Sequence, residues 1–345
     1  MARKCVAVGD VFITPDMMKK GIEGFEGLKL CCQYFYFGTD NRHEMRNVVK
    51  IIETGGLNTL PLPEGLEKAV ADAEVIMVHL CPVTEKLLSK AKKLKLILCN
   101  RGGHENIDIA AATRRKVAVV LNPIHNANAV AEFTVGLILN EVRNITRSAI
   151  ALQNGQWREK YPNSAAIREL KDMTIGIIGF GAVGKMLYDK LVAFNCRFLL
   201  NDLFENHALI NKNIAEFVPL ERLLKESDIV TLHARMSKKS ILLGQREFSM
   251  MKPTAYFINT ARSYMVDTAA LADALRSGRI TGAAVDVYDK EPIEPDHPLL
   301  GLDNVTLTNH RGGDTINSYS DSPAMMMVEA LNFFNGDIPR YWINR

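Results

Sequence analysis

Residues 179–184 read Gly-Phe-Gly-Ala-Val-Gly, which is the spacing of a loop that can hold a diphosphate. The loop directly follows the apolar run 173–178 and precedes a segment in which Leu187 and Leu191 have helical spacing. Glycines at these positions allow a tight turn, close approach of a pyrophosphate to the backbone, and close packing of helix on strand, while the helix N-terminus offers free N–H donors. The pattern predicts a dinucleotide-binding site that includes Gly179, Gly181, Ala182, Val183 and Gly184.

An acidic residue further along distinguishes between the two nicotinamide dinucleotides. Asp202 lies 18 residues after Gly184, at the end of the next predicted strand, where a carboxylate can accept from a ribose 2′-hydroxyl. The apolar Leu203 and Phe204 follow where a 2′-phosphate would need an arginine, and the carboxylate itself would repel that phosphate. The sequence therefore predicts NAD as the cofactor. A glycine turn with a purely structural role is the less favoured alternative.

Three later segments each place polar residues directly after a short apolar run. They are residues 258–263 (Ile-Asn-Thr-Ala-Arg-Ser), 284–292 and 308–313 (Thr-Asn-His-Arg-Gly-Gly). Because ligands of open α/β sheets bind at the carboxyl ends of the strands, Arg262, Glu291 and His310 are candidate reactive residues. Taken singly, each has a plainer explanation as a surface ion pair, a turn residue or a structural histidine. Their order after a glycine-rich loop favours a common role.

Together with the loop, this set resembles the D-isomer-specific 2-hydroxyacid dehydrogenase family, and within it the phosphoglycerate dehydrogenase-like branch. The family has Arg, Glu and His in the same order with similar spacing, here 29 residues from Arg262 to Glu291 and 19 from Glu291 to His310. The resemblance extends from about residue 94 to residue 313. It implies hydride transfer between NAD(H) and a small 2-oxoacid or D-2-hydroxyacid.

The resemblance also implies a role for each matching residue. Arg262 would bind the carboxylate and carbonyl oxygen of the oxoacid, His310 would transfer the proton, and Glu291 would orient His310 and favour its charged form. Asp286 matches the position that contacts the nicotinamide carboxamide. The other residues expected at the cofactor are His233, which ends a predicted strand, Thr260 and Ala261. Backbone N–H groups of a loop in the first domain would take the substrate carboxylate, at Arg101, Gly102 and Gly103.

Three positions depart from the family's pattern. Asn309 and Arg311 flank His310 where the family usually has proline and an apolar residue, so a cation beside His310 is expected to alter the pH optimum. Lys116 stands where glycine commonly ends a helix, and Ser263 replaces the glycine after the catalytic arginine. None of these departures argues against the reaction.

Short apolar runs that alternate with helical patterns must position these residues. The runs are 5–8, 28–36, 75–78, 94–99 and 117–120, and then 174–178, 197–201, 229–233, 255–259, 282–286 and 305–308. The alternation predicts an α/β protein with two doubly wound parallel sheets, and 345 residues suffice for two domains. A Rossmann NAD-binding domain, 124–313, would be inserted into a flavodoxin-like substrate domain made of 1–123 and 314–345. Helices are expected over 126–154, joining the domains, and over about 315–334, where methionines 325–327 would pack.

Composition disfavours several other classes of protein. The net charge is +3, and the longest basic run spans only residues 114–116, so no nucleic-acid partner is expected. No apolar stretch is long enough for a membrane span, and Asp10 interrupts the one run that resembles a signal peptide. The six cysteines form no C-x-x-C pair, and the histidines lack metal-ligand spacing. These features predict a cytoplasmic protein without a metal.

Two alternatives use the same motifs. An NADH-binding regulator similar to corepressors of this fold is disfavoured because Pro- and Ser-rich flanks are lacking, and formate oxidation because loop 101–106 differs. Polar Arg101, His104 and Asn106 favour a substrate with a second acidic or hydroxylated group, such as a phosphorylated or sugar-derived acid. The resemblance further implies a homodimer, in which the helix at 126–154 packs against its twin.

Overall fold

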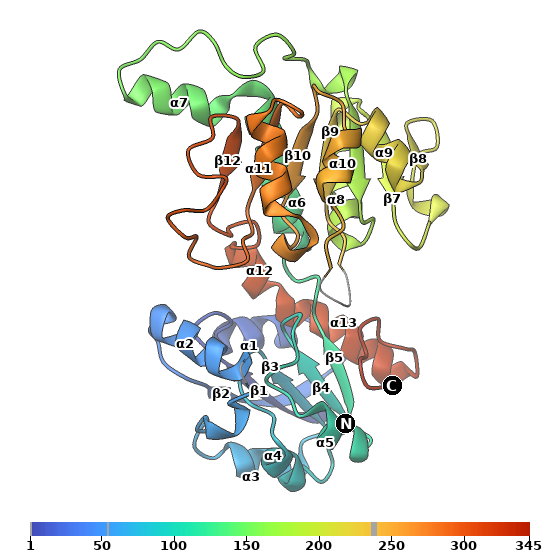
Figure 1. Ribbon diagram of the computed structural model, residues 1–345. Coiled ribbons are helices and arrows are strands. Elements are labelled where there is room, and N and C mark those ends of the chain that lie inside the picture. The colour runs from blue at the N-terminus through green and yellow to red at the C-terminus, as the bar shows by residue number, and fades with distance from the viewer. Residues whose placement is uncertain (1, 54, 236–239) are drawn as a thin grey trace. The chain divides into compact units, whose positions relative to one another are not determined.

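The computed structural model describes residues 2–53, 55–235 and 240–345, and the chain divides into two compact units (Figure 1). Unit 1 consists of Met1–Asn126 and Thr315–Arg345, and unit 2 of Ala127–Asp314. The expected boundaries after residues 123 and 313 lie within three residues of these limits.

Unit 1 contains a parallel sheet of order β2-β1-β3-β4-β5, which is the flavodoxin-like order. Its strands are β1 (Arg3–Gly9), β2 (Leu30–Tyr36), β3 (Val75–Val78), β4 (Leu96–Cys99) and β5 (Ala118–Leu121). Its helices are α1 (Pro15–Glu23), α2 (Arg42–Glu53), α3 (Leu66–Ala69), α4 (Glu85–Lys90), α5 (Ile109–Arg114), α12 (Ile316–Ser320) and α13 (Ser322–Asn335). Strands β3, β4 and β5 are buried throughout and uniformly apolar, as a parallel sheet covered on both faces requires.

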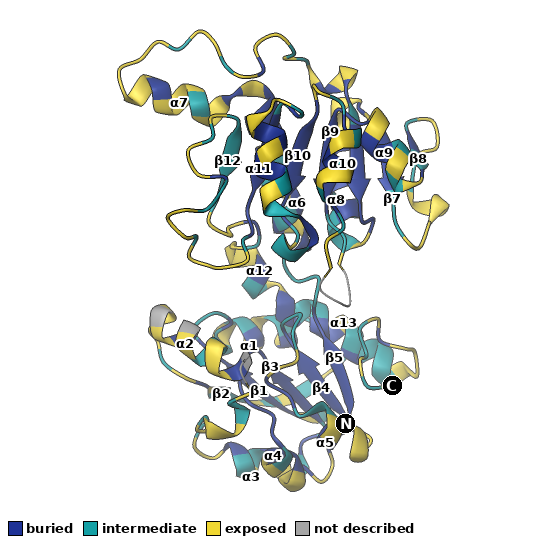
Figure 2. Ribbon diagram, in the orientation of Figure 1, coloured by how far each residue is buried: buried dark blue, intermediate teal, exposed yellow. Residues whose placement is uncertain are grey.

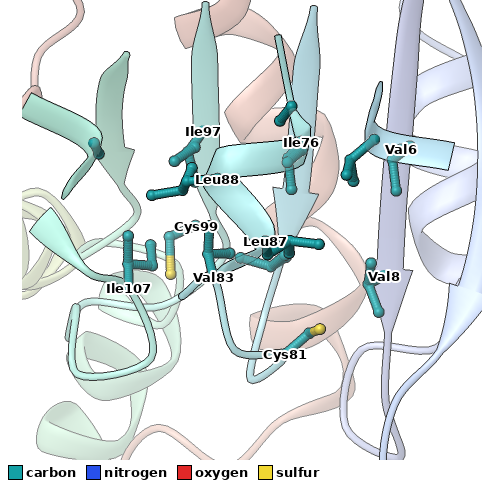
Figure 3. Close-up of a cluster of buried hydrophobic side chains, with 14 of the residues drawn as sticks. Val6, Val8, Ile76, Cys81, Val83, Leu87, Leu88, Ile97, Cys99 and Ile107 are labelled. Atoms are coloured by element: carbon teal, nitrogen blue, oxygen red, sulfur yellow. The ribbon is translucent and has the colours of Figure 1, made fainter. Parts of the chain in front are cut away.

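Side chains of β1 alternate between two cores, one on each face of this sheet. Val6 and Val8 pack with Ile76 and other residues in the cluster of Figure 3. Cys5 and Ala7 face the opposite way and pack with methionines 326 and 327 of α13. The C-terminal helix therefore covers unit 1, and its methionines are packing residues, as expected.

Unit 2 contains a parallel sheet of order β12-β11-β10-β9-β6-β7-β8, which is the Rossmann order extended by one strand. Its strands are β6 (Thr174–Ile178), β7 (Arg197–Asn201), β8 (Ala215–Phe217), β9 (Ile229–Leu232), β10 (Tyr256–Asn259), β11 (Gly282–Val285) and β12 (Val305–Leu307). Its helices are α6 (Ala127–Arg143), α7 (Ile145–Gln153), α8 (Ala182–Leu191), α9 (Leu220–Glu226), α10 (Gln245–Met250) and α11 (Thr268–Arg276). The strands are mostly buried and the helices expose their outer faces (Figure 2). The predicted fold class, two doubly wound parallel sheets, is confirmed.

Two elements of unit 2 differ from the sequence-based expectation. The single helix expected over 126–154 is divided into α6 and α7 at Asn144, whose φ of 55° is left-handed. Asparagine tolerates this conformation, and Asn144 is buried, with its amide donating to the Asn163 side chain at 2.6 Å. Strand β8 was not expected because it has only three residues and lies at the edge of the sheet.

The expectations about cysteines, metal ligands and membrane spans can be compared with the described residues. All six cysteines are free, and Cys5, Cys81, Cys99 and Cys196 are buried. Among the residues that the structure describes, no three His, Cys, Asp or Glu side chains are placed to hold a metal ion. No helix in these same ranges has the length and apolarity needed to cross a membrane.

Candidate active site

The candidate residues of unit 2 lie at the carboxyl edge of its sheet. The order of the strands reverses between β6 and β9, and open α/β sheets bind ligands at such a point. The residues that follow the ends of successive strands are Gly179 after β6, Asp202 after β7, His233 after β9, Thr260 after β10, Asp286 after β11 and Thr308–His310 after β12. The sheet therefore brings this predicted set to one edge of unit 2.

The three glycines of the loop after β6 serve different purposes. Gly179 has a φ of 92°, and a Cβ there would lie 2.3 Å from the Ala234 nitrogen. A Cβ on Gly184 would lie 2.1 Å from the Gly179 oxygen, so this glycine lets α8 pack closely on the strand. A Cβ on Gly181, by contrast, would meet nothing within 4 Å. Gly181 therefore leaves open space where α8 begins, and because α8 has no side-chain cap, its first N–H groups are available to an anion.

Asp202 is tied to this loop. Its Oδ2 accepts from the Phe180 N–H at 2.6 Å and its Oδ1 from the Phe204 N–H at 3.0 Å. Each carboxylate oxygen keeps a second lone pair, which suits it to a ribose diol. Leu203 and Phe204, the residues taken as unsuited to a 2′-phosphate, are almost fully exposed.

The ends of β9 and β10 carry small or uncharged groups. Burial lowers the pKa of His233 to about 3, so its ring is neutral at physiological pH, and its Nε2 lies 2.8 Å from the Thr231 hydroxyl oxygen. The buried Thr260 hydroxyl lies 2.9 Å from that of Thr134 on α6. Ala261 follows with its N–H donating to the Asn259 side chain at 3.0 Å.

Asp286 is the anchor of the loop that contains His310. This carboxylate is 1% exposed and accepts hydrogen bonds from three groups of the loop. The donors are the Thr308 hydroxyl at 2.6 Å, the Arg311 N–H at 2.9 Å and the Gly312 N–H at 2.8 Å. Asp286 thus fixes the backbone on both sides of His310.

His310 and Glu291 form a close pair. The Nδ1 atom of His310 lies 2.9 Å from both Oε1 and Oε2 of Glu291, and both side chains are partly exposed. The Arg311 guanidinium, next to His310 in the chain, forms an ion pair with Asp314 at 2.7 Å, and its effect on the pH optimum stays a prediction. The arrangement leaves Nε2 of His310 as the ring atom that can exchange a proton with a ligand.

Arg262 is exposed at the end of the β10 turn. Its Nη1 donates to the Ala261 carbonyl at 2.7 Å, and the described part of the chain contains no carboxylate in an ion pair with it. Asn259, which sequence analysis did not single out, braces this turn. Its side chain donates to the Arg262 carbonyl at 3.3 Å in addition to accepting from Ala261. The signal in the sequence that could have identified Asn259 was a polar residue at the end of an otherwise apolar strand.

In unit 1 the loop 101–103 follows β4 at the carboxyl edge of its sheet. Arg101 forms an ion pair with Glu105 at 3.4 Å, and its carbonyl accepts from the Asn122 N–H at 3.0 Å. His104 is exposed. The expectation for Asn106 is wrong, because this side chain is fully buried and donates to the carbonyls of His79 and Cys81.

A second carboxylate–histidine pair, unassigned by sequence analysis, lies at the same edge of unit 1. Asp10 follows β1 and His79 follows β3, and His79 Nδ1 lies 2.9 Å from Asp10 Oδ2. The buried Asp10 also accepts from the N–H groups of Phe12, Ile13 and Leu80. The His79 ring meets Phe12 and Tyr319 edge-on. Both residues directly follow strands, which was the only signal in the sequence.

Comparisons with known proteins show which family this chain resembles. A family model described as the NAD-binding domain of D-isomer specific 2-hydroxyacid dehydrogenase matches residues 135–312. The chain is 36% identical over 293 residues to a glyoxylate reductase of Thermofilum pendens, which covers 83% of this chain and 85% of that protein. It is 33% identical over 318 residues to a D-3-phosphoglycerate dehydrogenase of Methanocaldococcus jannaschii, covering 89% of this chain and 58% of the longer relative.

A solved structure shows the same fold over the whole chain. It is an NAD-complexed D-isomer specific 2-hydroxyacid dehydrogenase from Lactobacillus delbrueckii ssp. bulgaricus, with a TM-score of 0.76 at 22% identity, covering 98% of this chain and 99% of that one. The fold, the glycine-rich loop and these matches define an NAD-dependent oxidoreductase. The chain belongs to the D-isomer-specific 2-hydroxyacid dehydrogenase family. The open space at Gly181 and the uncapped start of α8 fit its cofactor, NAD.

Proposed function

We propose that this enzyme reduces a small 2-oxoacid to the D-2-hydroxyacid, with His310 as the proton donor. The observation that carries the proposal is the His310–Glu291 pair, at the same sheet edge as the glycine-rich loop. When bound, NADH would supply a hydride to C2 of the oxoacid, and NAD+ would accept one from the hydroxyacid in the reverse direction. In reduction, the proton on His310 Nε2 passes to the carbonyl oxygen as that oxygen gains charge, and oxidation of the hydroxyacid reverses this transfer.

Glu291 would determine which ring nitrogen of His310 is reactive. A carboxylate can only accept hydrogen bonds, so contact with both Glu291 oxygens keeps the proton on Nδ1. The same negative charge stabilises the imidazolium that exists before reduction and after oxidation. Glu291 is therefore proposed as a positioning residue.

Arg262 would bind and polarise the oxoacid. Among the described residues, the Ala261 carbonyl is the one acceptor that engages the Arg262 side chain, so the guanidinium keeps paired donors for a carboxylate. A donor aimed at the carbonyl oxygen would also stabilise the negative charge that develops there. Asp286 would hold the His310 loop and, with the one lone pair left on Oδ2, accept from the nicotinamide carboxamide.

Unit 1 is proposed as the substrate domain and unit 2 as the cofactor domain. The N–H groups of Arg101, Gly102 and Gly103 suit a substrate carboxylate. Because several relatives are named glyoxylate reductase, glyoxylate is the first substrate to test. With Asn106 buried, a second acidic or hydroxylated group on the substrate is now supported by Arg101 and His104 alone. The reducing, cytoplasmic location remains a prediction based on the free cysteines.

A homodimer is also proposed, because unit 2 exposes several large apolar side chains along α7 and the segment after it. They are Ile145, Ile150, Leu152 and Trp157, the last of which is 84% exposed. Large exposed apolar side chains close together in the chain are typical of subunit interfaces. Light scattering should give about twice the chain mass of 38.5 kDa, and a monomer at all concentrations would contradict the proposal.

The decisive experiment is a screen of NADH consumption over small, apolar, phosphorylated and sugar-derived 2-oxoacids. Turnover is expected with at least one of them and should be lost in His310→Asn. NADH binding without turnover of any oxoacid would instead favour a regulatory protein of this fold.

A further inference from the structure

A cleft of about 1150 Å³ lies in unit 1 at the amino-terminal edge of its sheet, the edge opposite the loop 101–103. Backbone hydrogen bonds place the starts of four strands side by side there. The Arg3 N–H donates to the Lys29 carbonyl at 3.2 Å, and the Glu74 N–H to the Lys4 carbonyl at 2.9 Å. The Lys95 N–H donates to the Glu74 carbonyl, also at 2.9 Å. Residues just before or at the starts of β1, β2, β3 and β4 therefore line one hollow.

Positive charge is concentrated in this cleft. The basic lining residues are Arg3, Lys4, Lys29, Lys92, Lys93 and Lys95. Only two acidic residues, Asp72 and Glu74, line it with them. The whole chain has 42 basic and 39 acidic residues, a nearly even balance, whereas the described residues that line the cleft include six basic and two acidic ones. Positive charge is therefore strongly enriched in the cleft.

The two carboxylates are already engaged. Glu74 pairs with Arg3 at 2.8 Å and with Lys95 at 2.7 Å, and Asp72 pairs with Lys4. The hydrogen bond from Lys4 holds the pKa of Asp72 below its usual range. The Arg3 guanidinium is further fixed over the Phe334 ring, 3.8 Å from its centroid. These contacts engage three of the six basic side chains, and the two carboxylates balance two of the six positive charges.

The other three basic side chains, Lys29, Lys92 and Lys93, form no such ion pair with a described residue, although the charge of Lys93 also helps to lower the pKa of Asp72. All three are exposed, and within the described ranges no carboxylate lies at ion-pair distance from any of them. Like charges held close together repel one another, and an anion bound between them relieves that repulsion. The cleft is therefore suited to a ligand that carries several negative charges.

We propose that this cleft binds a small molecule that carries a chain of phosphate groups, such as a nucleoside triphosphate. Ammonium groups bind phosphate as compact point charges, and the three lysines together carry more positive charge than one phosphate group of about −1.5 to −2 can neutralise. The volume exceeds that of most small-molecule pockets, which span about 300–1,000 Å³. The half-buried Leu28 adds an apolar surface on which the organic part of such a ligand can pack. This site is separate from the proposed reaction and does not depend on it.

The test is isothermal titration calorimetry of the full chain with tripolyphosphate, in the presence of saturating NADH so that the glycine-rich loop is occupied. A parallel titration with adenosine triphosphate shows whether the organic part contributes. We expect binding that weakens strongly between about 50 and 200 mM salt. The variant Lys29→Gln/Lys92→Gln/Lys93→Gln should bind tripolyphosphate at least about 10-fold more weakly, since each lost lysine removes a phosphate contact.

A matched control removes the same charge elsewhere. Lys19, Lys68 and Lys212 are exposed lysines outside the cleft, and their triple replacement by glutamine should leave binding within about twofold of wild type. A melting temperature equal to that of the wild-type protein in both variants would show that folding is intact. The proposal is overturned if tripolyphosphate does not bind at low salt, if the cleft variant binds like wild type, or if orthophosphate binds as tightly.

Discussion

The Nδ1 atom of His310 lies 2.9 Å from each carboxylate oxygen of Glu291, although 19 residues separate them in the chain. His310 has a φ of 56°, and a left-handed conformation costs a residue with a Cβ roughly 1–2 kcal/mol. The hydrogen bonds that Asp286 accepts from Arg311 and Gly312 hold the chain in this conformation. One carboxylate therefore orients the imidazole, and a second maintains the backbone that carries it.

Replacing His310 by asparagine should separate catalysis from substrate binding. The variant loses the proton donor but keeps Arg262, so kcat for oxoacid reduction should fall by about 10²–10⁴ with little change in KM. Steady-state kinetics with NADH would measure both quantities. Full turnover in His310→Asn would exclude this histidine as the acid.

Arg262→Ala, unlike His310→Asn, should impair both catalysis and substrate binding. Because this guanidinium is proposed both to bind the carboxylate and to stabilise charge on the carbonyl oxygen, kcat should fall and KM should rise together. Unchanged NADH affinity, measured by fluorescence titration, would show that the cofactor site is intact. A fall in kcat with an unchanged KM would contradict the proposed role of Arg262 in substrate binding.

Glu291→Gln tests the positioning role of the carboxylate. Glutamine keeps the size of the side chain but replaces one acceptor by a donor, so the ring of His310 is no longer held in one tautomer. We expect kcat to fall on the order of 10- to 100-fold, a smaller loss than in His310→Asn, with KM unchanged. Adding Glu291→Gln to His310→Asn should cause no further loss, because the two residues act as a unit. Additive losses would contradict the pairing.

Two glycine variants should distinguish cofactor contact from folding. At Gly181 a Cβ meets no protein atom, so Gly181→Ala should keep the melting temperature but weaken NADH binding at least about 10-fold by obstructing the pyrophosphate. Gly179→Ala should lower the melting temperature, because that residue has a positive φ and a Cβ would lie 2.3 Å from Ala234. If Gly181→Ala bound NADH with wild-type affinity, the proposed position of the diphosphate against Gly181 would be wrong.

Asp202→Ala should affect the two nicotinamide dinucleotides unequally. The loss of hydrogen bonds to the ribose diol should weaken NADH binding by about 10-fold or more, whereas NADPH should lose less because repulsion of its 2′-phosphate disappears as well. Dissociation constants for both dinucleotides would show this. A wild-type enzyme that already prefers NADPH would contradict the assignment.

His125 should make the stability of unit 1 depend on pH. Burial lowers the pKa of His125 from its ordinary value of 6.5, while its Nδ1–H donates to the Ser318 carbonyl at 2.9 Å. Below pH 6.5 the unfolded chain therefore binds a proton that the folded chain does not, so stability falls as the pH falls. The melting temperature should drop less between about pH 7.5 and 5.5 in His125→Gln than in wild type. His104→Gln, at an exposed histidine, is the control and should keep the wild-type pH dependence.

Much of the fold follows from local sequence patterns. Parallel strands covered on both faces must be apolar throughout, so they appear as short apolar runs, and the predicted runs 174–178 and 197–201 coincide with β6 and β7. The glycine-rich loop is equally local, because a tight turn and a close helix require glycine at fixed spacing. Edge strand β8 and the break at Asn144 escaped prediction, since three residues carry little pattern and asparagine does not by itself interrupt a helix.

The relationships between distant segments were decided only by the tertiary structure. Strand order places Asp10 beside His79, 69 residues away, and turns Asn106 inward to brace two carbonyls. The cleft lined by Lys29, Lys92 and Lys93 exists because strand starts that are far apart in the chain become neighbours in the sheet. Residue spacing along the chain specifies which side chains follow a strand, whereas the pairing of strands, set by packing of the whole sheet, specifies which of them meet.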